Sequence, residues 1–239
     1  MPRAQRITRE LVLDAGMRLV DKEGLDALTM RRLGERLGTD PAMVYRHFRG
    51  KEELLEALAD ALFAGSRGNG ETGRIDGAPS GAPLTGDWRE ALRSMGHGIR
   101  SALLAHPALI AVAVRRPPRG EATFRGIDAG LRLLLSAGIA PRDAAPGYQA
   151  VLFYALGFAV LEAPFAAAPD GGAADQARTH QALASLSPQD YPSIAATIDH
   201  LYDPDLHRQF DHGLRLLIAG LATSTPSQAR STGKGTETT

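Results

Sequence analysis

The sequence predicts an all-α protein, with short N-terminal helices arranged as a helix-turn-helix and a larger helical region behind them. Three observations support this fold class. Apolar residues recur three and four positions apart along most of the chain, which is the spacing of one helix face. Segments with this spacing begin at Thr, Asp or Pro and end at Gly, as helices do. No segment alternates apolar and polar residues as a half-buried strand would.

Three short helices are predicted near the N-terminus. The first begins after the N-cap residue Thr8 and ends at Gly24. The second begins after Thr29, and the third opens with the cap and first-turn pair Asp40-Pro41 and runs about two turns to Phe48. Their apolar faces contain Leu11, Val12, Ala15, Leu19, Met30, Leu33 and Leu37.

Composition and spacing divide the whole chain into five parts. Residues 1–52 form the helix-turn-helix domain, and residues 53–64 continue as a connecting helix that begins at Lys51. Residues 65–86 are rich in Gly and have no helical period, so we expect a linker or an irregular connection there. Residues 87–222 form the C-terminal helical domain, and the Ser/Thr/Gly-rich residues 223–239 form a disordered tail.

The first half of the C-terminal domain is predicted to contain two helices with a short segment between them. Asp87 with Glu90 resembles a capping box and opens a helix that ends at His106-Pro107. The short segment covers residues 108–115, and a further helix with Phe124, Ile127 and Leu131 ends at Gly138.

The second half is predicted to contain two strong helices. Pro141 opens a long one that runs toward Pro164, and a loose, partly helical connection follows it. Asp203-Pro204 caps the last helix. Its amphipathic stripe consists of Phe210, Leu214, Leu217 and Leu221.

Charge and composition narrow the class of protein. The 239 residues can bury a substantial core, and the absence of cysteine rules out disulfides, thiol nucleophiles and cysteine-ligated metals. The N-terminus lacks the apolar run of a secretory signal, and the longest apolar stretches are interrupted by Gly or ended by Pro short of a membrane span. We therefore expect a cytoplasmic protein with no membrane partner. Residues 1–51 hold 11 Lys/Arg against 7 Asp/Glu, which fits a module that meets phosphates.

The N-terminal helices have the pattern of a DNA-reading unit. Leu33, Leu37, Val44 and Phe48 can form the apolar underside that fixes the crossing of two helices. Arg46 points away from that underside and is the one residue there able to contact guanine in a bidentate manner. The remaining side chains suit phosphates or the groove surface. The predicted DNA contacts are Thr29, Arg31, Pro41, Ala42, Met43, Tyr45, Arg46, His47 and Lys51.

These residues resemble the N-terminal domain of the tetracycline-repressor (TetR) family. The resemblance includes the Gly24-Leu25 turn, the Leu37-Gly38 turn, and the Tyr-x-His-Phe motif that ends at Phe48 and is followed by Lys51-Glu-Glu-Leu-Leu. It implies a homodimeric regulator of transcription that binds double-stranded operator DNA. The residues do not distinguish a repressor from an activator.

The rest of the chain resembles, more loosely, the C-terminal domain of the tetracycline repressor. The landmarks are Trp88-Arg-Glu-Ala-Leu-Arg, Arg115-Arg-Pro-Pro118, Leu156-Gly-Phe-Ala-Val-Leu-Glu162 and Phe210-x-x-Gly-Leu-x-Leu-Leu. The resemblance implies a pocket for a small-molecule effector and a dimer interface made by two long C-terminal helices. The implied pocket residues are Met95, Ile99, Val112, Phe124, Tyr148 and Phe158, and the implied interface residues are Phe210, Leu214, Leu217 and Leu221.

The chain departs from the family pattern where a magnesium-bound tetracycline would be held. Ser66, Met95, Ile99 and Val112 stand where the repressor has polar ligand-binding residues. Apolar side chains do not ligate a hydrated magnesium ion. We therefore expect a mostly apolar effector, no metal and no cofactor.

Plainer interpretations remain open beside these predictions. The histidines are scattered singly, so we expect surface or packed histidines rather than ligands. The aromatic residues of the C-terminal domain can fill a core, and the Phe210–Leu221 stripe can face its own subunit. No phosphate loop, nucleophile motif or metal cluster points to an enzyme. An effector-independent helical adaptor is the alternative to a ligand-responsive regulator.

Overall fold

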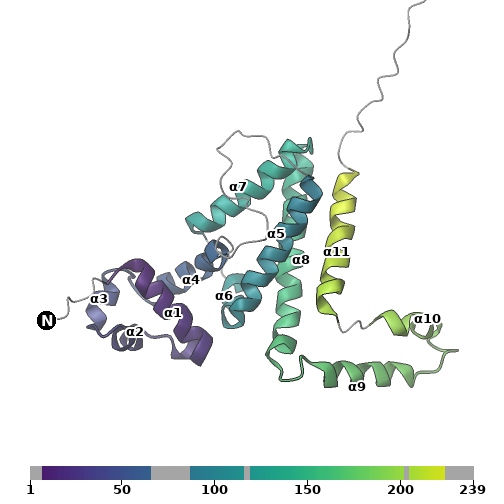
Figure 1. The fold of residues 1–239 in the computed structure, drawn as a ribbon, viewed down its shortest axis with the longest axis horizontal. Coiled ribbons are helices and arrows are strands. Elements are labelled where there is room, and N and C mark those ends of the chain that lie inside the picture. Colours follow the sequence, from purple (N-terminus) through teal and green to yellow (C-terminus); the bar gives the residue numbers. More distant parts are fainter. Residues whose placement is uncertain (1–6, 66–86, 116–118, 202–204, 224–239) are drawn as a thin grey trace, which may run out of the picture.

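The computed structural model describes residues 7–65, 87–115, 119–201 and 205–223. Within these ranges every regular element is a helix, which confirms the all-α prediction (Figure 1). The bounds are α1 Arg9–Glu23, the 3-10 helix η1 Leu25–Ala27, α2 Met30–Arg36, α3 Pro41–Tyr45, α4 Lys51–Gly65, α5 Trp88–Ala105, α6 Pro107–Arg115, α7 Glu121–Ser136, α8 Pro141–Ala167, α9 Ala173–Ala184, α10 Pro192–Leu201 and α11 Leu206–Ala222. The linker beyond Gly65 with Ser66, and the tail beyond Thr223, lie outside the described residues.

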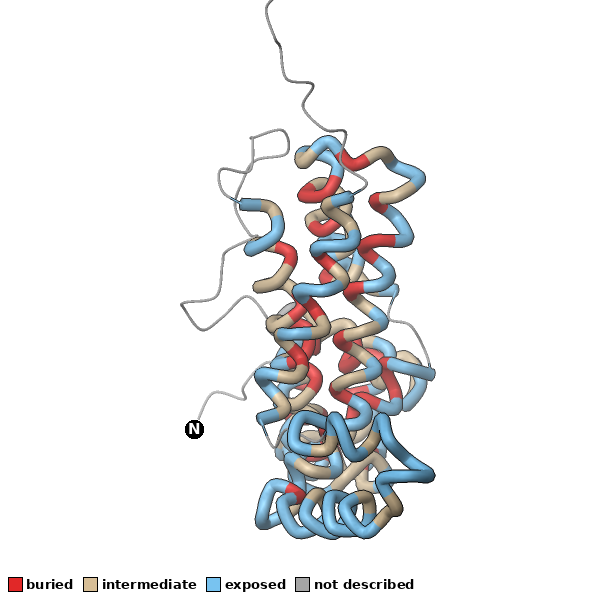
Figure 2. Tube along the Cα trace, turned by 90° about the vertical axis from the view of Figure 1, so that its right-hand side faces the viewer, coloured by how far each residue is buried: buried red, intermediate tan, exposed pale blue. Residues whose placement is uncertain are grey.

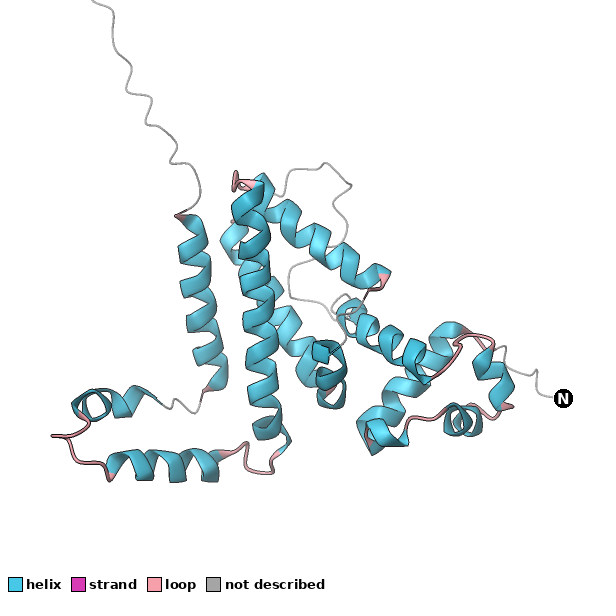
Figure 3. Cartoon of the chain, turned by 180° about the vertical axis from the view of Figure 1, so that it is seen from behind, coloured by secondary structure: helices cyan, strands magenta, loops and turns pink. Residues whose placement is uncertain are grey.

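The helices form a small N-terminal group and a larger C-terminal bundle, joined by α4 (Figure 1). Helices α1 to α3 make up the small group, which we call the reader after the DNA-binding role expected of it. In the bundle, which we call the sensor after the effector pocket that the resemblance implies, α5, α8 and α11 pack side by side, and α6 and α7 lie between them and α4. Seen from behind, α9 and α10 extend away from the sensor as a pair (Figure 3).

The N-caps predicted for four helices are confirmed. The side chains of Thr8, Thr29, Asp40 and Asp87 each accept a hydrogen bond from a backbone N–H in the first turn of the helix that follows. Gly24 ends α1 with φ of 81°, a conformation in which a side chain would be strained. Local chemistry therefore sets most helix starts.

The long helix α8 continues past the predicted breaks. It runs 27 residues through Gly157 and past Pro164, although a proline in a helix interior costs about 3 kcal/mol. Packing against α5, α6, α7 and α11 offsets that cost. The expectation that the apolar stretches fall short of a membrane span was wrong, because α8 is long and apolar enough to cross one by length and composition. In the most apolar stretch of α8, 22% is buried within the chain. The helix therefore exposes an apolar face that packing within the chain does not bury.

The region after α8 is more helical than the sequence indicates. The expected loose connection contains α9 and α10, which have no fully buried residue. Asp203-Pro204 lies outside the described residues, and Asp205 caps α11 by accepting a hydrogen bond from the backbone N–H of Arg208. The N-cap of α11 is therefore Asp205, two residues after the predicted Asp203. Aspartate favours the N-cap position, so the sequence does not distinguish the two.

Buried residues lie along the inner sides of the sensor helices and between α4 and the reader, whereas the α9–α10 pair is exposed (Figure 2). In the reader, Leu33, Val44 and Phe48 are almost completely buried and Leu37 packs against them. These are the predicted underside residues. Their burial fixes the angle between α2 and α3.

The close approach of α2 to the start of α3 depends on Gly34. A Cβ atom there would lie 3.0 Å from the backbone nitrogen of Pro41 and 3.0 Å from the carbonyl oxygen of Thr39. Backbone atoms cannot move aside without shifting α3. No local pattern marks Gly34 for this role, because the atoms it approaches belong to the turn and to the start of the next helix.

Replacing Gly34 with Ala is expected to destabilise the reader by about 1–3 kcal/mol, because the added methyl group overpacks the helix crossing. Thermal and denaturant unfolding measure the change. Gly126→Ala is the matched control, since a Cβ atom at Gly126 meets nothing within 4 Å and alanine favours the helix. Equal stability of the two variants would show that the α2–α3 crossing tolerates a side chain.

Candidate DNA interface and sensor core

The reader presents the outer side of α3 to solvent. Val44 is fully buried beneath the helix, whereas Ala42, Tyr45 and Arg46 are exposed. Pro41 and Met43 are partly buried at its edge. Ala42 has a small side chain, so α3 can approach a groove closely there, and Tyr45 and Arg46 are the large exposed side chains.

Arg46 is an unneutralised cation at the end of α3. Its guanidinium makes one weak internal contact, from Nη1 to Sδ of Met43 at 3.7 Å, and no ion pair within the described residues. By contrast, Arg32 and Arg36 both pair with Glu23, and Arg31 pairs with Glu35. Arg46 therefore keeps its full donor capacity for an external partner.

Thr29 and Arg31 lie at the exposed start of α2. The hydroxyl of Thr29 accepts from the backbone N–H of Arg32 at 3.2 Å, which leaves its own proton for another acceptor. The Arg31–Glu35 pair is largely exposed, so a phosphate can compete for that guanidinium at little cost.

Two predicted phosphate contacts also hold the reader together. Lys51 Nζ donates to the carbonyl oxygen of Leu25 at 3.2 Å, with further donors left over. The ring Nε2 of His47 lies 3.1 Å from the carbonyl oxygen of Ile7, so Nε2 must carry the proton in that contact.

Arg9 is a reader residue that the sequence analysis missed. Its Nη1 donates to the carbonyl oxygen of His47 at 3.0 Å, and its guanidinium carbon lies 4.2 Å from the centre of the Phe48 ring. This side chain fastens α1 to the end of the Tyr-x-His-Phe motif. Only the fold brings residues so far apart in sequence together.

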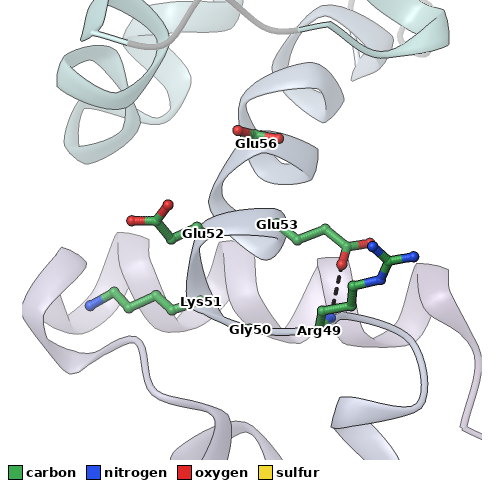
Figure 4. Close-up of a pocket in the computed structure, with 6 residues that line it drawn as sticks. All are labelled: Arg49, Gly50, Lys51, Glu52, Glu53 and Glu56. Atoms are coloured by element: carbon green, nitrogen blue, oxygen red, sulfur yellow. Dashed lines mark hydrogen bonds between the residues drawn. The ribbon is translucent and has the colours of Figure 1, made fainter.

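A shallow depression lies at the start of α4. It is lined by Arg49, Gly50, Lys51, Glu52, Glu53 and Glu56 (Figure 4). The Glu53 carboxylate accepts from the backbone N–H of Arg49 at 2.8 Å, and Arg49 and Lys51 point to opposite sides of the helix. The lining is of mixed charge, and its glutamates suit a helix N-terminus.

Three implied pocket residues are buried in the sensor interior. Ile99, Val112 and Tyr148 are at most 8% exposed. Met95 and Phe158 pack partly buried against the same core. Phe124 is different, because it is 53% exposed on α7 and does not belong to this buried group.

The Tyr148 side chain is 7% exposed in the sensor. Its ring lies against Gly130, where a Cβ atom would come within 2.5 Å of Cε2 of Tyr148 and 3.2 Å of Cε of Met95. The phenol has no hydrogen bond in the part of the chain that the structure describes, and burial raises its pKa.

Phe210 and Leu214, which the sequence predicts for the dimer interface, pack inside the single chain. Both are fully buried within their own chain. The Phe210 ring stacks on Tyr154 with a centroid distance of 5.2 Å, and Leu214 packs on Gly96. Leu221 packs against Gly147, and Leu217 is partly buried. An amphipathic stripe indicates that a face is covered but not which neighbour covers it.

The outer faces of α8 and α11 carry exposed apolar side chains instead. Phe153 is 63%, Leu161 72% and Leu216 62% exposed. Val160 on α8 is 43% exposed. We call these four residues the outer apolar face.

A buried ion pair joins the sensor helices. Arg100 on α5 pairs with Glu162 on α8 through two hydrogen bonds, one of them from Nε to Oε2 at 2.6 Å, and each residue is 8% exposed. Nη1 of Arg100 also lies 3.4 Å from Nδ1 of His207 on α11. The guanidinium lies 5.0 Å from the centre of the Phe210 ring. Sequence reasoning missed this cluster, because its members are 62 and 107 positions apart.

A second polar cluster lies beside it. Asp211 on α11 accepts from Arg93 at 2.7 Å and is 3.0 Å from Nε2 of His97. Burial alone would raise the pKa of Asp211, but the hydrogen bonds with His97 and Arg93 outweigh it and keep that pKa below its usual value. Helices α5 and α11 are therefore connected by charged groups as well as by apolar packing.

The reader geometry defines the class of protein. A short helix with a buried underside, set across a second helix by a tight turn and ending in an unpaired arginine, is the DNA-binding unit of a helix-turn-helix regulator. The family model described as bacterial regulatory proteins of the tetR family matches residues 12–58, and the tetracycline repressor-like C-terminal domain matches residues 80–225. The chain belongs to the TetR family of DNA-binding transcriptional regulators, which is not a family of enzymes.

Relatives match along most of the chain. The tetracycline repressor protein class A from transposon 1721 of Escherichia coli is 33% identical over 211 residues, which are 88% of each chain. The transcriptional repressor DrrR1 of Streptomyces coeruleorubidus is 27% identical over 90% of this chain and 77% of its own. The crystal structure of ActR from Streptomyces coelicolor in complex with actinorhodin has a TM-score of 0.77, 27% identity, and coverage of 92% of this chain and 99% of that one.

Proposed function

We propose that the chain is a homodimeric repressor that binds a near-palindromic operator through α3 and releases it when a small, mostly apolar molecule enters the sensor. The exposed, unneutralised Arg46 carries the DNA-reading part of this proposal. A bidentate arginine can distinguish guanine from the other bases in the major groove. Two copies related by a two-fold axis would read successive major grooves about one helical turn apart. Such a regulator acts in the cytoplasm, where its operator lies.

The outer apolar face supports the dimer. Its residues lie on α8 and α11, and exposed apolar patches of this kind mark interaction surfaces. A two-fold interface uses the same patch on both subunits. Burial of this face in a dimer interface also accounts for a helix in a DNA-binding protein that is as long and as apolar as a membrane span.

Replacing Leu216 with Glu is expected to raise the dimer dissociation constant on the order of 100-fold, because the two-fold axis brings two charges into one apolar interface. Sedimentation or light scattering over a concentration series measures the shift, and circular dichroism checks that the helices persist. Leu135→Glu on α7 is the control for an exposed leucine outside this face. A Leu216→Glu dimer as tight as the unmodified one would place the interface elsewhere.

The interior of the sensor supports an apolar effector with at least one hydrogen-bonding atom. Ile99 and Val112 offer buried hydrocarbon where a magnesium-bound antibiotic would need polar groups. The unpaired phenol of Tyr148 offers a single polar contact of the kind that orients a ligand. ActR, a relative by fold, is known in complex with actinorhodin, which supports a sensor of this class.

The experiment that tests the function is binding of the purified protein to DNA flanking its own gene, titrated over salt, with an unrelated duplex as control. Saturable binding of the flanking duplex alone at physiological salt supports the proposal and yields the operator for ligand-release screening. Equal, weak binding of both duplexes, lost as salt rises, would contradict sequence-specific reading at this site. Operator binding that a broad panel of apolar compounds never releases would favour the effector-independent adaptor.

A further inference from the structure

The connecting helix α4 reaches the sensor through a carboxylate. Asp60 lies midway along α4, and its Oδ1 accepts from the backbone N–H of Thr123 at 2.9 Å and from the Thr123 hydroxyl at 2.6 Å. Its Oδ2 accepts from the backbone N–H of Ala122 at 3.3 Å. Asp60 therefore caps the first turn of α7 from a different helix.

The α7 N-terminus is built to receive this carboxylate. Gly120, the residue that precedes α7, makes no side-chain cap of its own. A Cβ atom at Gly120 would lie 2.1 Å from Cγ of Asp60, so any side chain at position 120 would displace the carboxylate. The free N–H groups and the positive end of the helix dipole both favour a negative group there.

A second polar contact joins reader and sensor at another point. Nδ1 of His106, at the end of α5, lies 2.9 and 3.0 Å from the two carboxylate oxygens of Asp21 on α1. Otherwise α4 packs on α5, α6 and α7 largely through apolar side chains. Apolar contacts are non-directional and allow small sliding, whereas hydrogen bonds fix a direction.

We propose that Asp60 is a positioning residue for DNA recognition: by capping α7 it holds α4, and with it the reader, at one angle to the sensor. In a dimer that angle sets the distance between the two recognition helices. Asp60 would then determine which half-site spacing the protein accepts, although it touches no DNA. The spacing consequence rests on the proposed dimeric operator binding, whereas the fixed angle within one chain does not.

Three variants disturb the contact in different ways. Asp60→Asn removes the charge and one acceptor, Gly120→Ala pushes the carboxylate off α7, and Thr123→Val removes only the hydroxyl donor. Asp128→Asn, on the exposed side of α7, is the matched acid-to-amide control. The double variant Asp60→Asn with Gly120→Ala should behave like either single variant, because both break the same contact.

The DNA readout uses a duplex selected from a random pool by the unmodified protein, together with copies that have one base pair inserted or removed between the half-sites. Asp60→Asn and Gly120→Ala are expected to lose about tenfold in affinity for the selected spacing and to discriminate less between spacings. Affinity for an unrelated duplex and its salt dependence should stay unchanged, because the phosphate-contacting side chains are intact. Unchanged spacing discrimination in both variants would overturn the proposal.

A DNA-independent readout separates failure of the positioning role from failure of the proposed function. The chain has no cysteine. The double substitution Lys22→Cys and Ser136→Cys, at two exposed positions of one chain, therefore takes spin labels at those two sites alone. Labelled chains diluted with unlabelled protein report the distance between α1 and the end of α7 within one chain. The distance distribution should be narrow in the unmodified protein and in Asp128→Asn, and broad in Asp60→Asn and Gly120→Ala. Equal widths in all four proteins would overturn the positioning role whether or not the protein binds DNA.

Discussion

Replacing Arg46 with Ala is expected to weaken operator binding by on the order of 100-fold or more. A bidentate arginine–guanine contact is worth about 1–3 kcal/mol, and a dimer loses two of them. Binding to an unrelated duplex should change little, because most of that affinity comes from other phosphate contacts. Titrations of the selected and the unrelated duplex at the same salt concentration measure the ratio.

Arg46→Lys sharpens this test. Lysine keeps the charge but lacks the planar fork, so discrimination against a mutated base should fall while the salt dependence stays the same. Arg125→Ala, a largely exposed arginine on α7, is the control for removing a positive charge far from α3. If Lys restores full specificity at position 46, the residue contacts a phosphate and does not read a base.

Replacing Glu162 with Ala is expected to cost about 3–5 kcal/mol of unfolding free energy, the largest loss of stability among the variants considered. The change leaves the Arg100 charge buried without its carboxylate, and such an unpaired charge is far more costly than a missing contact. Denaturant unfolding at one fixed protein concentration measures it, since dimer stability depends on concentration.

The double replacement of Arg100 with Met and Glu162 with Leu separates charge burial from packing. Apolar residues of similar volume need no partner, so this double variant should recover most of the lost stability. Glu121→Ala, which breaks an exposed pair with Arg125, should cost less than about 1 kcal/mol. A Glu162→Ala loss as small as that of Glu121→Ala would mean that water reaches the Arg100 guanidinium.

In the proposed function, the buried charges of the sensor bear on which ligand it accepts. Arg100 and Glu162 satisfy one another between α5 and α8, while the Tyr148 phenol on α8 has no partner in the described residues. A neutral ligand that accepts one hydrogen bond can use the phenol without breaking the ion pair. A charged ligand would have to compete with a partner that is already well placed.

The sequence by itself determined the reader and the start of most helices. Thr29, Asp40 and Pro41 act within one turn of their own positions, so their chemistry can be read without knowing the fold. The apolar underside of α3 and the exposed position of Arg46 follow from helical spacing in the same way. The family resemblance, carried by those residues, was confirmed along the chain.

Only the tertiary structure decided which neighbours each helix has. Spacing predicts that one face of α11 is covered, but packing within the chain shows that Phe210 lies against Tyr154 and leaves Leu216 outside. The contact of Asp60 with the start of α7 joins groups more than 60 positions apart, and no local signal announces it. Local chemistry specifies where a helix begins and which face is apolar, whereas the partner of that face depends on long-range packing that only the folded chain defines.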